Sequence, residues 1–208
     1  MTAPKIHSPW AMERAAKSEI EAQKRESVIQ AAAISFARNG YHGTTMDQIA
    51  EMLDVSKPTL YKYYKNKSEL LHACDEKATA RFLELARESV ELDGTALDKI
   101  KHYQYSSVEF LTDEFGRALA LVEETGLDPE GRQHWREARD EITEMFRDIV
   151  REGIEKKEIN PRVDPKLTML ALFGAFNLIA KWFKPDGGYT AHEICDQFFE
   201  VFINGLKP

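Results

Sequence analysis

The chain has 208 residues, a formal net charge of −7 and two cysteines. This length allows one or two domains with a sizeable core. No apolar run is long enough to cross a membrane, and the first residues lack a signal-peptide pattern. Cys74 and Cys195 are too few for a disulfide framework or a zinc site. We therefore expect a cytoplasmic protein without membrane attachment.

The charge is divided unevenly along the chain. Residues 1–72 carry ten basic and eight acidic side chains, whereas residues 73–208 carry eighteen and twenty-seven. A polyanion such as DNA repels an acidic surface, so we expect only the N-terminal part to contact one.

The chain is expected to open with an extension, residues 1–17, followed by a helix over residues 18–39. Ser8-Pro9 can cap a helix that starts at Trp10, or the extension can be a loose arm. Gly40 is predicted to end the first helix. Its expected buried residues are Val28, Ala32 and Phe36.

Three short helices are predicted between residues 44 and 71. The first has Thr45 as its N-cap and Gln48 as the capping-box partner. Asp54 occupies the following turn, where a left-handed backbone is needed. Ser56 caps the second helix, whose first turn contains Pro58. Asn66 caps the third helix, with Glu69 as its partner; the residues expected to face inward are Leu60, Tyr64, Leu70 and Leu71.

This arrangement is typical of a helix-turn-helix, whose second helix enters the major groove of DNA. From Val55 to Lys67 there are four lysines and no acidic residue. Base contacts are expected from Lys57, Thr59 and Tyr63, and phosphate contacts from Thr45, Tyr61, Tyr64 and Lys67. The complete set of predicted DNA-binding residues is Thr45, Ser56, Lys57, Pro58, Thr59, Tyr61, Lys62, Tyr63, Tyr64 and Lys67. The alternative is a surface hairpin with a solvated lysine face.

The segment from Ile29 to Leu71, IQAAAISFARNGYHGTTMDQIAEMLDVSKPTLYKYYKNKSELL, resembles the DNA-binding domain of the TetR family of bacterial transcriptional regulators. Phe36, Gly40, the Val55-Ser56 turn and Lys67 carry the resemblance, together with neighbouring residues. Two positions depart from the family pattern, because Asp54 replaces the usual turn glycine and Pro58 replaces a small residue. The operator sequence therefore stays open.

The rest of the chain is expected to be helical as well. The third short helix continues to about Glu91, and Asp93-Gly94 ends it. Further helices are predicted over residues 95–112, 114–124, 129–157, 165–184 and 190–206. The expected fold is all-α with about nine helices, divided into an extension (1–17), a helix-turn-helix domain (18–72) and a ligand-binding and dimerisation domain (73–208).

The last two predicted helices are the least polar, which indicates burial in a core or by a partner. We interpret them as the seam of a homodimer, in which two helices from each subunit form a four-helix bundle. The TetR resemblance implies the same arrangement, and an ordinary monomeric core is the alternative. The predicted interface residues are Leu170, Gly174, Ala175, Leu178, Ile194, Phe198, Val201 and Phe202.

The TetR resemblance also implies a small-molecule pocket in the C-terminal domain. Candidates are aromatic or polar residues of the middle helices: Tyr103, Phe110, Trp135, Arg139, Phe173, Phe176, Asn177 and Trp182. Asn177 is the preferred single candidate, because a buried amide in an apolar run needs a partner. The segment from Phe173 to Leu206 loosely resembles regulators of fatty-acid or other acyl-CoA breakdown.

No catalytic or cofactor site is predicted. His192 and Cys195 are close on one helix, but no orienting group or oxyanion site accompanies them. The histidines lack metal-ligand spacing, and there is no glycine-rich phosphate loop. The expected function is a dimeric repressor that binds a palindromic DNA operator and is released by a small-molecule effector. The alternative is a helical protein–protein adaptor that keeps the helix-turn-helix shape without reading DNA.

Overall fold

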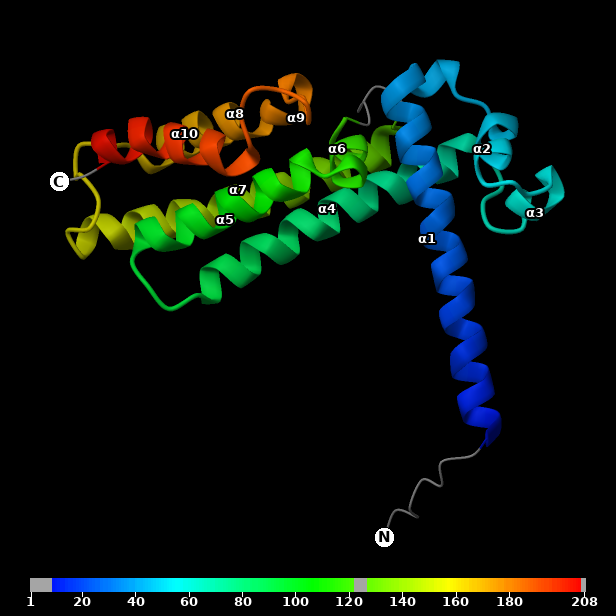
Figure 1. Cartoon of the computed structure of the whole chain (residues 1–208). Helices are drawn as coiled ribbons and strands as arrows, with labels where there is room; N and C mark the ends of the chain where they lie inside the picture. The colour runs from blue at the N-terminus through cyan, green and yellow to red at the C-terminus, as the bar shows by residue number, and fades with distance from the viewer. Residues whose placement is uncertain (1–8, 122–126, 207–208) are drawn as a thin grey trace, which may run out of the picture.

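All regular structure in the described residues, 9–121 and 127–206 of this computed structural model, is α-helical. Figure 1 shows an elongated body of long helices with a smaller unit at one end. The helices are α1 (Pro9–Gly43), α2 (Met46–Met52), α3 (Lys57–Tyr61), α4 (Lys67–Glu91), α5 (Ala96–Thr112), α6 (Glu114–Ala120), α7 (Pro129–Glu155), α8 (Pro165–Asn177), α9 (Ile179–Trp182) and α10 (Ala191–Leu206). The predicted all-α fold is confirmed.

Two hydrophobic clusters divide the molecule into a head and a body. The head cluster joins α1, α2, α3 and the start of α4, and it buries Ile49, Leu60 and Leu70 completely. The body cluster joins the rest of α4 to α5, α7, α8 and α10 around Phe146 and Phe176. Because α4 contributes to both clusters, head and body share one continuous helix (Figure 1).

The head cluster also includes a part of the chain far away in sequence. Ala118 and Leu119 of α6, together with Leu127, are buried in it. Gly116 allows α6 to turn tightly after α5, because a Cβ atom there would lie 2.1 Å from the carbonyl oxygen of Phe110. The head therefore completes its core with residues that follow α5.

The first helix includes the described part of the predicted extension. It begins at Pro9, which agrees with the predicted alternative of a helix starting at Trp10 and not with a loose arm. Figure 1 shows the N-terminal half of α1 standing clear of the body. Gly40 has a φ of 70° and ends the regular helix as expected. Residues 1–8 of the predicted extension lie outside the described residues.

The apolar segment 165–184 forms two helices rather than the single helix predicted. α8 ends at Asn177, and the short α9 follows after Leu178. The break brings Ile179 and Ala180 back into the body, where both are buried. Arg117 of α6 donates from Nε to the carbonyl oxygen of Ala180 at 3.0 Å, which satisfies a carbonyl near the end of α9.

Other predicted boundaries differ little from the structure. α5 begins after the N-cap Thr95, and α7 ends at Glu155. α6 ends at Ala120; the predicted end of this helix at Glu124 and the start of the following turn fall in residues 122–126, outside the described residues.

One buried amide in the body makes a stability prediction possible. Gln104 of α5 is 1% exposed, and its Nε2 makes no hydrogen bond to any described residue. A buried donor without a partner carries its full desolvation cost. We expect Gln104→Met to raise the free energy of unfolding by about 1 kcal/mol in urea denaturation. The exposed Gln133→Met of α7 serves as the control; a less stable Gln104→Met protein would contradict the prediction.

Candidate functional site

The two predicted caps of the helix-turn-helix are present. The hydroxyl of Thr45 accepts from the backbone N–H of Gln48 at 3.2 Å, and the Gln48 side chain accepts from the N–H of Thr45 at 2.8 Å. Asp54 adopts the expected left-handed conformation, with a φ of 52°. Ser56 caps α3 by accepting from the N–H of Thr59. These features define where α2 and α3 begin and the turn that separates them.

Burial of one side of α3 in the head cluster determines which of its residues point outward. Leu60 is fully buried in the head cluster, and Tyr64 is buried beside it, as predicted. The opposite side of α3 and its end is exposed, namely Ser56, Lys57, Pro58, Tyr61 and Lys62. Thr59 is half-buried, and its hydroxyl is 2.8 Å from that of Ser56. Five of the ten predicted DNA-binding residues thus lie on one exposed surface.

Lys57 is held at the side of this surface by Asp47 of α2. The two charged groups are 2.7 Å apart, and hydrogen bonding to Asp47 raises the pKa of the Lys57 ammonium. Both side chains are more than half exposed, so the pair contributes little to stability. Lys57 can therefore leave Asp47 for another anion at small cost.

Lys67 lies at the start of α4 and bridges to the end of α1. Its ammonium donates to the carbonyl oxygens of Tyr41 and Thr44, at 2.5 and 2.8 Å. It also lies 4.4 Å from the centre of the Tyr41 ring. The side chain is half-buried, so it stabilises the α1–α2 link in addition to any phosphate contact.

The cap of α4 differs from the prediction in one detail. Asn66 accepts from the N–H of Glu69 at 2.8 Å, as expected of an N-cap. The carboxylate of Glu69 binds the N–H of Lys65 and not that of Asn66. The reciprocal bond is therefore displaced by one residue toward the preceding turn.

The exposed part of α1 supports the end of α3, which the sequence did not indicate. Tyr63 donates its hydroxyl to Glu21 at 3.0 Å. The guanidinium of Arg25 lies 5.8 Å from the Tyr63 ring centre and 6.0 Å from that of Tyr64. Hydrogen bonds from Lys24 and then Tyr63 lower the pKa of Glu21, while burial raises the pKa of Tyr64. Tyr63 and Tyr64 are thus partly engaged within the head.

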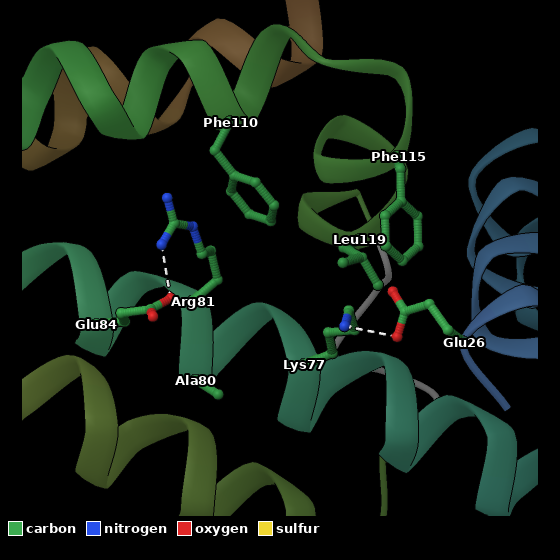
Figure 2. A pocket seen from close by; sticks show the side chains of 8 residues that line it. All are labelled: Glu26, Lys77, Ala80, Arg81, Glu84, Phe110, Phe115 and Leu119. Carbon is green, nitrogen blue, oxygen red and sulfur yellow. Dashed lines mark hydrogen bonds and ion pairs between the residues drawn. The ribbon is translucent and has the colours of Figure 1, made fainter. Parts of the chain in front are cut away.

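A pocket of about 620 Å³ lies where α1, α4, α5 and α6 meet. Its apolar lining consists of Ala80, Phe110, Phe115 and Leu119. Its charged lining consists of Glu26, Lys77, Arg81 and Glu84. Figure 2 shows the phenyl rings above and the charged side chains along its lower side. This mixture suits a ligand with an apolar part and a charged part.

Of the eight predicted effector-binding residues, Phe110 alone lines this pocket. Tyr103 and Phe173 pack with Phe146 in the body core, and Phe176 is fully buried in a second aromatic cluster. Trp135 is half-buried under the guanidinium of Arg139, which is itself exposed.

The reason for preferring Asn177 is wrong. Its side chain is exposed at the end of α8, so no buried amide requires a partner there. Trp182 is also 47% exposed. Seven of the eight residues that line the pocket were not predicted to contact a ligand: Glu26, Lys77, Ala80, Arg81, Glu84, Phe115 and Leu119. They come from α1, α4 and α6, and the helical spacing of the charged residues on α4 is equally typical of a solvated helix face.

The predicted interface residues on α8 and α10 form an exposed apolar face. Leu170, Leu178 and Val201 are 56%, 52% and 74% exposed. Gly174 is exposed and open, and Ala175, Phe198 and Phe202 are half-buried. Ile194 is an exception, because it is 5% exposed and belongs to the body core. Its assignment to the interface is a misreading of which side of α10 faces the body.

Comparison with protein families decides the family of the chain. Residues 28–74 match the model of bacterial regulatory proteins of the tetR family. Residues 93–206, more than half of the chain, match the tetracyclin repressor-like C-terminal domain. The chain belongs to the TetR family. It is accordingly a transcriptional regulator with a helix-turn-helix domain.

Relatives of this TetR-family chain span almost its whole length. The fatty acid metabolism regulator protein of Bacillus subtilis is 27% identical over 88% of this chain and 95% of its own. The structure of the ketosteroid transcriptional regulator KstR2 of Mycobacterium tuberculosis has a TM-score of 0.80, 18% identity and full coverage of both chains. AibR in complex with isovaleryl coenzyme A and operator DNA has a TM-score of 0.75 and 23% identity, over 85% of this chain and 96% of that one.

The cysteines and His192 of this TetR-family protein lie in the body and in the core of the head, apart from the surface of α3. Cys74 and Cys195 are buried, and burial raises the pKa of each thiol to about 12. His192 pairs with Glu109 at 3.5 Å on the surface. In residues 9–121 and 127–206, no three His, Cys, Asp or Glu side chains are grouped so as to hold a metal ion. None of the described helices is both long and apolar enough to span a bilayer.

Proposed function

We propose that this chain is a homodimeric transcriptional repressor that binds a palindromic operator and is released by an acyl-CoA or a related acid. The observation that carries the proposal is the exposed surface of α3, with Lys57, Tyr61 and Lys62 facing outward and no acidic residue in the helix. A short cationic helix held outward by a buried leucine can enter a major groove.

The apolar face of α8 and α10 supports the homodimer. Exposed leucine and valine side chains at Leu170, Leu178 and Val201 carry an unfavourable contact with water. A second copy of the same face covers them through a two-fold axis, with Gly174 allowing close approach of the helices. Two heads about 34 Å apart then meet successive major grooves of a palindrome.

Two observations support an acyl-CoA or related acid as effector. AibR, which shares the fold, is known in complex with isovaleryl coenzyme A and operator DNA, and a relative regulates fatty acid metabolism. The pocket between head and body offers Phe110 and Phe115 to an acyl chain, and Lys77 and Arg81 to an anionic group. A ligand there releases DNA only if it prefers one of two head arrangements.

Salt-dependent DNA binding tests the proposal. An operator fragment is selected from a random duplex pool, and fluorescence anisotropy measures its affinity at several salt concentrations. The repressor is expected to lose affinity steeply as salt rises, because phosphate contacts release counterions. A flat salt dependence, or no binding at low ionic strength, would support the adaptor instead. Addition of octanoyl-CoA is expected to lower the affinity.

Lys67→Ala separates the phosphate contact from the structural contact of this lysine. We expect weaker binding to all sequences alike and a salt slope flatter by about one unit, because one phosphate contact is lost. The melting temperature is also expected to fall, since two carbonyl oxygens lose their donor. Lys156→Ala, which removes the exposed lysine directly after α7, is the control. If only the melting temperature changes, Lys67 has no contact with phosphate.

A further inference from the structure

The pocket described above touches both the head and the body. Glu26 belongs to α1, the helix on which the head is built, while the other charged lining residues belong to α4. The Lys77 ammonium lies 2.6 Å from the Glu26 carboxylate, so this ion pair joins α1 to α4. A change at Lys77 therefore acts directly on the helix that positions the helix-turn-helix.

The two cations of the pocket lie one helical turn apart on α4. Lys77 and Arg81 are spaced four residues apart, and this spacing places them on one face. Arg81 binds Glu84 at 2.6 Å through Nη1, and Glu88 lies 3.8 Å from the same atom. Figure 2 shows the Arg81 guanidinium beside the Phe110 ring, with one terminal nitrogen joined to Glu84 and the other pointing away from it.

We propose that Lys77 and Arg81 bind the anionic group of the effector, and that this removes Lys77 from Glu26 and loosens the head from the body. This inference rests on the proposed function and adds to it the residues that couple the pocket to the head. The effector belongs to the class of amphipathic anions, with its apolar chain against Phe110, Phe115 and Leu119. The Glu26–Lys77 pair is the contact that holds the DNA-binding arrangement while the pocket is empty.

The geometry favours an anion over a cation as the ligand. A guanidinium group has five donors, and both ion pairs of Arg81 run through Nη1, which leaves its other edge to carboxylate or phosphate oxygens. The exposed fraction of each cation is also smaller than that of its acidic partner: 38% against 43% for Lys77 and Glu26, and 41% against 60% for Arg81 and Glu84. The acids can turn to solvent while the cations stay in the pocket.

The strength of the ion pair suits a contact that a ligand can break. Both partners are about two-fifths exposed. A pair of this kind changes the equilibrium constant between the two arrangements of head and body by at most about five-fold. An effector that gains two charge-assisted contacts and an apolar surface offsets this loss easily. Because the pair stabilises the operator-binding arrangement in this proposal, anything that breaks it is expected to favour the effector and disfavour the operator.

The test uses the full-length protein, the selected operator fragment and three variants. Isothermal titration calorimetry measures binding of octanoyl-CoA, octyl phosphate and octylammonium, and anisotropy measures operator affinity with and without each probe. The variants are Glu26→Gln, Lys77→Met and the control Lys156→Met. All three positions are at least one-third exposed, so the variants are expected to fold.

Glu26→Gln is expected to bind the operator more weakly without a probe and both anions more tightly, each by at most about five-fold. Lys77→Met is expected to show the same weakened operator binding but to lose at least about five-fold in anion affinity. Opposite changes in anion affinity identify the Glu26–Lys77 pair as the contact that couples the pocket to the head. A merely structural role would change the anion affinity of both variants in the same direction. Lys156→Met is expected to match the unmodified protein.

Each contrary outcome overturns one part of the proposal: the role of the ion pair, the ligand class or the pocket. If octanoyl-CoA releases the operator but both pocket variants behave like Lys156→Met, the proposed role of the Glu26–Lys77 pair is wrong and the proposed repressor function stands. If octylammonium binds as tightly as octyl phosphate, the anion class is wrong. If neither anion binds the unmodified protein, the effector pocket is wrong, whereas operator binding itself is decided by the salt titration.

Discussion

Replacing Phe176 by alanine is expected to lower the free energy of unfolding by about 3–5 kcal/mol. The side chain is completely buried in the body, with ring centres of Phe198 and Phe199 at 5.3 and 5.4 Å and that of Phe202 at 6.3 Å. Removing it leaves a cavity between α8 and α10 and breaks three aromatic contacts. Urea denaturation at one fixed protein concentration measures the change.

The matched control for this substitution is Tyr189→Ala. Tyr189 is 69% exposed, so its loss is expected to change the unfolding free energy by less than about 0.5 kcal/mol. Phe176 was predicted from sequence to line the effector pocket. A small stability change combined with lost effector binding would restore that role, whereas the expected large loss assigns Phe176 to the core.

The double substitution Leu170→Glu with Val201→Glu is expected to convert the proposed homodimer to a monomer. Each protomer brings two carboxylates into a face that a dimer buries, and a desolvated charge without a partner costs several kcal/mol. Operator affinity is expected to fall by at least about 100-fold, because each head then binds its half-site alone. Light scattering after size-exclusion chromatography measures the mass, and anisotropy measures the affinity.

A control must carry the same added charge, since negative charge alone weakens DNA binding. Gln133→Glu with His134→Glu adds two carboxylates at exposed positions of α7, outside the apolar face. This protein is expected to stay dimeric and to keep most of its operator affinity. A dimeric Leu170→Glu/Val201→Glu protein would place the subunit contact elsewhere.

The helix-turn-helix could be predicted in detail because its signals are local. Thr45, Asp54, Ser56 and Asn66 act within three or four residues of themselves, so the sequence alone specifies each cap and turn. The break at Leu178 could not be predicted in this way. It depends on burial of Ile179 in the body and on Arg117 from a distant helix.

The pocket was largely missed for the same physical reason. Its lining comes from four helices, and a charged residue such as Lys77 has no local feature that separates it from a solvated surface lysine. Asn177 illustrates the opposite error. An amide in an apolar run suggested burial, but the face of α8 on which it lies is exposed, and only the packing of the helices against one another determines which face that is.

The inclusion of Ala118, Leu119 and Leu127 in the head cluster has a consequence for protein engineering. A fragment cut after residue 72 would keep every predicted DNA-binding side chain but would leave an uncovered apolar surface on α1. Such a fragment should be poorly soluble, and it would not serve as a portable module for fusion to other proteins. A usable DNA-binding fragment would need α6 grafted onto it. Alternatively, the apolar α1 residues that α6 covers would have to be replaced by polar ones.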